Sequence, residues 1–205
     1  ADTEGLVYLF RNLNTPLYPV FPPGERPRHS DGQFLHRYNN GGHARPDVTD
    51  WNNDGKKDLV ISDGHGAVML YLNTGTDAAP VLAPGVALTA GGNTIQIGTR
   101  SSVLVCDYNL DGRKDLVTAD QETGYKFFRN TGTDAAPVLA AAQAITFNGQ
   151  PVSYVRPNLG SYLDWDGDGK LDFIGCHFEN TIRFYRNIGS GAPGQFPQNA
   201  SPESQ

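Results

Sequence analysis

Residues 74–83 read TGTDAAPVLA, and the same ten residues recur at 131–140, a shift of 57 positions. The same shift carries Asp50 to Asp107 and then to Asp164. An identity of this length, in phase with other repeated residues, does not arise by chance. The chain is therefore built from repeated units, and a fixed period of this kind decides the fold.

A partial copy of the unit precedes the complete ones. GLVYLFRN at 5–12 aligns with GAVMLYLN at 66–73 at an offset of 61, so the first unit holds four extra residues between residues 21 and 50. The segments at 66–73, 124–130 and 181–187 are rich in β-branched and aromatic residues, follow a period of two and end at Asn or Asn-Thr-Gly. This pattern favours strands over helices.

Three or four short strands per unit, at a period of about 40–60 residues, are typical of a β-propeller blade. We therefore predict an all-β fold: a partial or multi-chain β-propeller of antiparallel strands, with about three full blades plus a partial one. The predicted boundaries within one repeat domain (1–205) are a partial blade with a basic insertion (1–45), two blades (46–102 and 103–159), an incomplete last blade (160–197) and a tail (198–205).

The composition excludes several classes of protein. Gly and Pro number 24 and 14 among 205 residues, which is too many for long helices, whereas 10% aromatic residues is too rich for a disordered chain. A formal charge of −6 argues against a general nucleic-acid binder. From this charge we expect no nucleic-acid partner. Uninterrupted apolar runs stay well below the ~18 residues that a membrane-spanning helix needs, so we expect no membrane span.

Each complete unit contains one nine-residue acidic loop, at 50–58, 107–115 and 164–172. Oxygen-bearing side chains stand at loop positions 1, 3, 5 and 9, glycine stands at position 6, and the backbone carbonyl of position 7 is a further donor. So many carboxylates and amides repel one another unless a hard cation neutralises them, and calcium accepts about six to eight oxygen ligands. The predicted ligands of three calcium ions are Asp50, Asn52, Asp54, Lys56 and Asp58; Asp107, Asn109, Asp111, Arg113 and Asp115; and Asp164, Asp166, Asp168, Lys170 and Asp172.

An EF-hand loop begins in the same way, but it needs an acidic residue at position 12 and flanking helices. Position 12 is Ile61, Thr118 or Gly175 here, and the flanks are strand-like. Plain Asp-Gly or Asn-Gly turns, capped by their own side chains, are the alternative. Magnesium is disfavoured because it keeps its waters and prefers rigid octahedral sites. The same oxygen positions in all three loops favour calcium.

At these residues the sequence resembles the FG-GAP/VCBS repeats. The resemblance rests on the loop D-x-[DN]-x-D-G-x-x-D-[LF], the strand G-x-x-x-[LF]-[YF]-x-N and the continuation T-G-T-x-x-x-P-V, and it covers residues 5–197. Similar blades occur in integrin-type heads, in a fungal lectin and in secreted bacterial lyases. The resemblance implies a calcium-stabilised propeller, usually outside the cytoplasm, and implies no single activity. Because Asn52 and Asn109 stand where the third loop has Asp166, the charge count predicts tightest binding at the third site.

Two further groups of residues are candidate binding sites. The irregular first unit gathers basic residues that form either a groove for a carboxylated or sulfated sugar or a solvated loop. The aromatic residues Trp51, Tyr108 and Trp165 follow the first Asp of each loop, where we expect packing between blades rather than stacking on sugars. The basic candidates are Arg26, Arg28, His36, Arg37, His43 and Arg45.

The sequence carries no nucleophile elbow, phosphate-binding glycine loop or zinc-binding histidine pair, so we assign no catalytic residue. The leading hypothesis is a non-catalytic, calcium-binding propeller segment of a secreted, cell-surface or periplasmic protein that binds carbohydrate, acidic or neutral, or protein. One alternative is part of a polysaccharide lyase that acts on acidic glycans. Another is a scaffold whose propeller is completed by self-association or by another chain.

Overall fold

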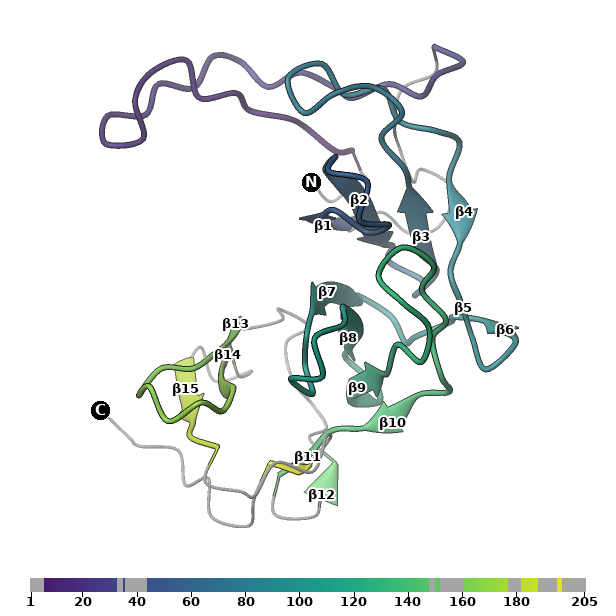
Figure 1. Ribbon diagram of the computed structural model, residues 1–205, viewed down its shortest axis with the longest axis vertical. Coiled ribbons are helices and arrows are strands. Elements are labelled where there is room, and N and C mark those ends of the chain that lie inside the picture. The colour runs from purple at the N-terminus through teal and green to yellow at the C-terminus, as the bar shows by residue number, and fades with distance from the viewer. Residues whose placement is uncertain are drawn as a thin grey trace.

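The computed structural model describes residues 6–32, 35, 44–147, 150–151, 161–176, 182–187 and 195–196. Within these residues the chain forms strands, turns and bends, and no helix. Figure 1 shows the main sheets following one another along an arc as the chain proceeds. The predicted all-β class is confirmed, and the arc of sheets is the arrangement expected for part of a propeller.

The first sheet consists of β1 (Arg45–Thr49), β2 (Asp58–Ser62), β3 (Val68–Tyr71) and β4 (Val86–Ala87), in that order. All neighbouring strands are antiparallel. β2 is buried along most of its length because both faces of this sheet are covered. Its Val60 packs toward the second sheet, whereas Ile61 packs toward the N-terminal segment.

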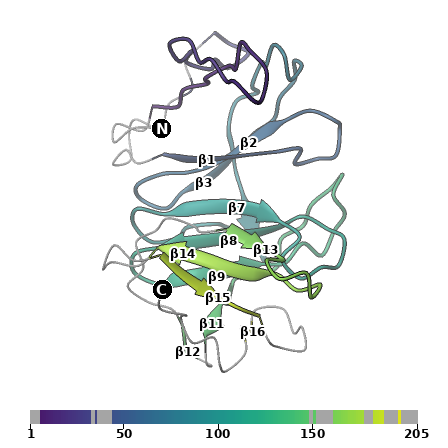
Figure 2. The same ribbon diagram turned by 90° about the vertical axis from the view of Figure 1, so that its left-hand side faces the viewer.

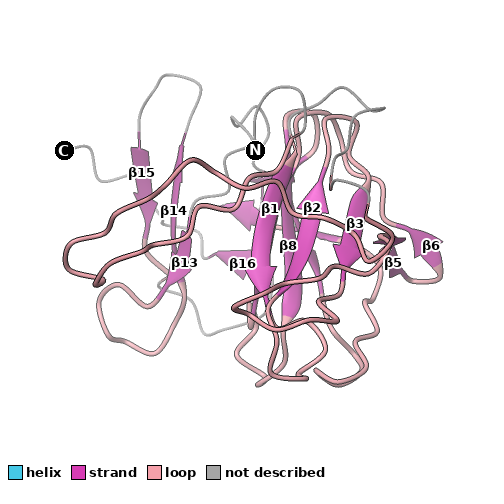
Figure 3. Cartoon of the chain, turned by 90° about the horizontal axis from the view of Figure 1, so that it is seen from above, coloured by secondary structure: helices cyan, strands magenta, loops and turns pink. Residues whose placement is uncertain are grey.

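The second and third sheets repeat this order. β7 (Ser102–Cys106), β8 (Asp115–Asp120), β9 (Gly124–Phe128) and β10 (Gln143–Ala144) form the second sheet. β13 (Ser161–Leu163), β14 (Asp172–Cys176) and β15 (Ile182–Tyr185) form the third. Figure 2 shows these sheets stacked one upon the next, and Figure 3 shows the axes of their strands roughly aligned, with loops at both ends.

Short strands lie between the sheets. β5 (Thr89–Ala90) and β6 (Asn93–Thr94) form a hairpin around Gly91 and Gly92. The segment from residue 87 to residue 97 therefore contains the end of β4 and this hairpin. β11 (Thr146–Phe147) pairs antiparallel with β12 (Gln150–Pro151) and parallel with β16 (Gln195–Phe196).

The hydrophobic cores lie between consecutive sheets. Trp51 belongs to the core between the first and second sheets, and Tyr108 belongs to the core between the second and third. Trp51 and Tyr108 are 5% and 8% exposed, whereas Trp165 is 63% exposed. The expectation that all three aromatic residues pack between blades is therefore wrong for Trp165. The physical reason is that Trp165 belongs to neither of the described cores between consecutive sheets.

The N-terminal segment has the local structure of a third and a fourth strand. Leu9 and Glu25 form an antiparallel bridge at the positions that Leu70 and Val86 hold in the first sheet. The Asn12 side chain accepts hydrogen bonds from the backbone N–H groups of residues 14 and 20, both 3.0 Å long. The equivalent Asn73 accepts from residues 75 and 81. The partial copy inferred at 5–12 is thus present in the described residues as a strand end followed by the same turn.

Candidate metal centres

The three acidic loops have one backbone frame, and each joins the first strand of a sheet to the second. The carboxylate at position 1 accepts the N–H groups of positions 5 and 6, at 3.0 and 2.9 Å for Asp50. The same two distances occur at Asp107 and at Asp164. The first aspartate therefore closes the loop into a ring through hydrogen bonds to the loop's own backbone.

The aspartate at position 9 joins the loop to the turn asparagine that follows the third strand of the same sheet. Asp58 accepts from the backbone N–H of Trp51 at 2.9 Å and from that of Asn73 at 2.7 Å. Asp115 and Asp172 make the corresponding pairs of hydrogen bonds, again at 2.7 Å to the turn asparagine. All three aspartates are 0% exposed. Each is a buried anion that links three segments of its sheet.

Two positions of each loop have a left-handed backbone. Position 6 is glycine, with φ of 83° at Gly55 and Gly112 and 82° at Gly169, as the loop motif requires. Position 4 is also left-handed, and there the residues differ: Asn53 (φ 60°), Leu110 (φ 57°) and Gly167 (φ 77°). A leucine in this conformation is strained, because the left-handed region is costly for a bulky L-residue.

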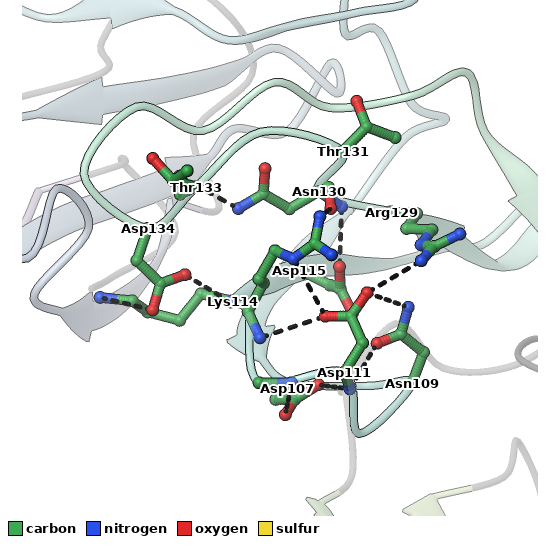
Figure 4. A network of polar contacts seen from close by, with 12 residues as sticks. Asp107, Asn109, Asp111, Lys114, Asp115, Arg129, Asn130, Thr131, Thr133 and Asp134 are labelled. Carbon is green, nitrogen blue, oxygen red and sulfur yellow. Dashed lines mark hydrogen bonds and ion pairs between the residues drawn. The ribbon is translucent and has the colours of Figure 1, made fainter.

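The repeated decamer docks onto the acidic loop. Asp77, in its first copy, accepts from the backbone N–H of Lys57, and Asp134 accepts from that of Lys114, both at 2.8 Å. The loop, the buried aspartate and the decamer turn thus form one polar network, which Figure 4 shows for the second unit. The third unit has Leu171 in place of the lysine.

Two polar contacts connect the first sheet to the second. The Lys114 ammonium donates a hydrogen bond to the backbone carbonyl of Asp50, so a residue of the second loop touches the first loop. Asp47, on β1, accepts the backbone N–H of Val105, on β7, at 2.7 Å. Neighbouring loops are therefore held in register by side chains as well as by the apolar cores.

Burial and hydrogen bonds shift the pKa values of the loop carboxyls in opposite directions. Burial raises the pKa of Asp58, and it raises that of Asp115 to about 6, even though backbone N–H groups oppose both shifts. Burial also acts on Asp111, but hydrogen bonds from Arg129 and Asn109 outweigh it, so the pKa of Asp111 lies below its usual value. A hydrogen bond from Lys170 lowers the pKa of Asp168. Ionised carboxylates here are costly unless a positive charge is near.

The donor sets fit a hard cation such as calcium. In the third loop, carboxylate oxygens of Asp164, Asp166 and Asp172 lie within 4.8 Å of one another. The first and second loops offer Asn52 and Asn109 at the corresponding position, so their sets combine carboxylates with an amide oxygen. All-oxygen sets of this size are what calcium prefers. The loops lie between strands, so the exclusion of an EF-hand agrees with the fold.

Basic side chains also reach these oxygens. Arg129 lies 3.0 Å from Asp111, and Lys170 lies 3.0 Å from Asp168. Arg186 contacts Asp166 through two of its nitrogens. Sequence reasoning missed these partners, although arginine at the residue before the turn asparagine in three of the four copies was a signal that could have found two of them.

The basic residues of the first unit are only partly described. Arg28 donates to the carbonyl of Gly32 at 2.8 Å, within its own turn. Arg45 lies on β1, where burial lowers its pKa, and Arg26 is half-buried. The other three candidates, His36, Arg37 and His43, lie outside the described residues. A basic groove in this unit therefore stays a prediction.

Comparison with known proteins supports the repeat. Residues 50–118 match the family model of the FG-GAP-like repeat. The match spans the first acidic loop, the decamer and the second acidic loop, so the resemblance read from the sequence is confirmed there. No curated protein matches the chain. Among the described residues, no helix is long and apolar enough to cross a membrane.

One solved structure with a similar course of the chain is a Tc holotoxin pore from Photorhabdus luminescens. The two share 21% sequence identity with a TM-score of 0.46, and the match covers 98% of this chain. The chain spans only 9% of the length of that toxin chain.

Proposed function

We propose that this chain, which carries an FG-GAP-like repeat, is a non-catalytic β-propeller segment whose acidic loops bind calcium. The observation that carries the proposal is the same oxygen-lined frame in three loops, each closed on a fully buried aspartate. When bound, calcium would supply the positive charge that neutralises the loop carboxylates. Asp50, Asp107 and Asp164, with the other loop oxygens named above, would hold it.

Calcium in these loops would act on stability. The loops connect the first two strands of each sheet, and position 9 also fixes the turn asparagine at the end of the third strand. An ion that binds only the folded chain stabilises it by mass action. We infer a structural role for calcium outside the cytoplasm, in a secreted or surface protein, where free calcium is plentiful.

Thermal melting tests this role. At calcium about 100-fold above the dissociation constant, each occupied site should raise the melting temperature by about 5–10 °C. A variant with Asp50→Asn, Asp107→Asn and Asp164→Asn should lose this rise. The exposed Glu122, which lies outside the loops, provides a matched control as Glu122→Gln. An identical melting curve in calcium and in excess chelator would contradict the proposal.

A role in binding another chain is supported by the third sheet. Trp165 is 63% exposed, although its counterparts Trp51 and Tyr108 are buried against the next sheet. The third sheet thus presents an apolar position that a further blade covers elsewhere in the molecule. We propose a second copy of this chain as the partner. Light scattering should then give a mass above that of the monomer, and Trp165→Ser should restore the monomer; a strictly monomeric wild-type chain contradicts the idea.

Binding of a glycan rests on the sequence alone. Its basic candidates lie in the first unit, and half of them fall outside the described residues. The lyase hypothesis has no assigned catalytic residue and also rests on the sequence alone. Carbohydrate binding therefore stays a prediction here, secondary to the calcium role.

A further inference from the structure

One position of the repeat differs among the units in a way that bears on the acidic loops. The residue before the turn asparagine is Arg11, Leu72, Arg129 and Arg186 in the four successive copies. In the complete units this residue directly follows the third strand, beside the loop of the same sheet. The position is thus able to place a positive charge against the loop, and the first complete unit is the exception.

Both arginines in complete units contact a loop carboxylate. Arg129 donates through Nη2 to Asp111 at 3.0 Å, and Arg186 donates through Nε to Asp166. These carboxylates belong to the predicted metal ligands, at loop positions 5 and 3. The carboxylate side chains are 19% and 20% exposed, whereas those of Arg129 and Arg186 are 45% and 57% exposed, so both pairs lie at the surface. Each guanidinium occupies an oxygen that a cation would use.

The N-terminal copy shows what the arginine does without such a loop. Arg11 donates to the backbone carbonyl of Ala78 at 2.7 Å and lies 3.6 Å from Glu25. Its partners are therefore on the first decamer and on its own sheet. The contact with an acidic loop occurs where the loop and the arginine belong to the same complete unit.

The first complete unit has Leu72 instead, and this side chain packs against the core between the first two sheets. Within the described part of the chain, no ion pair places a basic side chain on the carboxylates of the first loop. Three carboxylates stand in that loop: Asp50, Asp54 and Asp58.

We propose that Arg129 and Arg186 are internal counter-ions of the second and third acidic loops, and that each weakens divalent-cation binding at its own loop. The proposal rests on the calcium function proposed above. Each arginine relieves repulsion in the metal-free loop and competes with the cation for a carboxylate oxygen. Leu72 leaves the first loop without such a competitor.

Counting the basic side chains that contact each loop removes the advantage that the carboxylates alone give the third site. The first loop has three carboxylates, and the Lys114 ammonium donates to the carbonyl of Asp50 in that loop, which gives −3 + 1 = −2. The third has four carboxylates, but Arg186 and Lys170 contact them, which gives −4 + 2 = −2. The second has three carboxylates with Arg129 and, at 3.7 Å, Arg113, which gives −3 + 2 = −1. The second site is therefore the weakest by charge, and the first and third are equal.

The expected size of the effect follows from Coulomb's law with screening. One positive charge about 5 Å from a divalent ion, in a water-like dielectric and at about 0.1 M salt, changes its affinity by about fivefold. Removing Arg186 should therefore tighten the third site by about fivefold, and adding an arginine at Leu72 should weaken the first by a similar factor.

Terbium luminescence measures each site separately on the full chain. The sequence has two tryptophans, Trp51 in the first loop and Trp165 in the third, so energy transfer from tryptophan to bound Tb³⁺ reports these two loops. Trp51→Phe and Trp165→Phe assign the two signals. The test variants are Arg186→Leu, Arg186→Gln and Leu72→Arg. Arg11→Leu is the matched control, because it removes an arginine from the same repeat position away from the acidic loops.

Each outcome decides one or both proposals. Tighter Tb³⁺ binding at the third loop in both Arg186 variants, weaker binding at the first loop in Leu72→Arg and no change in Arg11→Leu support the proposal. If the wild-type chain binds Tb³⁺ but removal of Arg186 leaves the affinity unchanged or lowers it, the counter-ion role is overturned and the calcium function stands. If the third loop binds Tb³⁺ in the Arg186 variants and not in the wild-type chain, the counter-ion role is supported and calcium binding at the third loop of the wild-type chain is overturned. If no variant binds Tb³⁺, both proposals fail.

Discussion

The first acidic loop and the third have the same backbone but different surroundings. In both, the first aspartate closes the ring and the last one anchors the turn asparagine. Trp51 is buried beneath the second sheet, whereas Trp165 is exposed. Leucine precedes the turn asparagine in the first unit and arginine does so in the third. The repeated residues set the geometry of the loop, and the residues that differ set its packing and charge.

The largest expected difference between the two loops concerns the tryptophans. Trp51→Ala should lower the free energy of unfolding by about 3–5 kcal/mol, because it leaves a large cavity between two sheets. Trp165→Ala should change it by less than about 1 kcal/mol, since an exposed side chain leaves no cavity. Urea unfolding of the monomeric chain measures both. Similar losses in the two variants would show that Trp165 is covered.

Substitution of the buried aspartates should give the next largest effect. Asp58→Ala leaves the backbone N–H groups of Trp51 and Asn73 without their acceptor, and we expect a loss of about 2–4 kcal/mol. Asp172→Ala should cost less, because the N–H of the exposed residue Trp165 can find water. Urea unfolding in chelator isolates this effect from calcium binding. A larger loss for Asp172→Ala would contradict the comparison.

Asp47 forms a hydrogen bond that links the first sheet to the second. The second sheet has no equivalent side chain for the third, because Leu104 holds this position in the second unit. Asp47→Ala should cost about 1–2 kcal/mol, since the Val105 N–H loses its acceptor. Asp47→Asn keeps an acceptor and should cost less.

The pH dependence of the link has a definite sign. Burial raises the pKa of Asp47, against the hydrogen bonds from Val105 and Val48. The stability that this group contributes is complete below its ordinary pKa of about 3.9 and is lost as the pH rises through the raised value. Unfolding measured from pH 3 to pH 7 should therefore show this loss in the wild type and not in Asp47→Asn. An equal pH profile for the two chains would contradict the assignment.

The smallest predicted effect concerns loop position 4. Leu110 is left-handed, and the third loop has Gly167 there. Leu110→Gly should raise the free energy of unfolding by about 0.5–1 kcal/mol, because relief of the left-handed strain exceeds the added entropy of the unfolded chain. Gly167→Leu should lower it by a similar amount. Thermal melting compares the two changes, and a destabilised Leu110→Gly variant would argue against strain at this residue.

Much of the fold was available from the sequence because its signals are local and repeated. The decamer at 74–83 gave the period, and the Asp-Gly loops marked the turn between the first and second strands. The left-handed glycine at position 6 could be predicted as well, since few other residues adopt that backbone conformation.

The rest depended on the arrangement of the sheets. The local sequence does not give the exposure of Trp165, because that exposure depends on whether another sheet covers it. The contact between Lys114 and Asp50 joins two units, so the periodicity of one unit does not reveal it. The arginine contacts span 18 and 20 residues, and only the pairing of the third strand with the second brings the two ends together.

The most direct test of the account is a calorimetric titration of the intact, chelator-treated chain with calcium. We expect three calcium ions per chain. Absence of any calcium-binding heat at millimolar calcium would contradict the central claim that the acidic loops are metal sites.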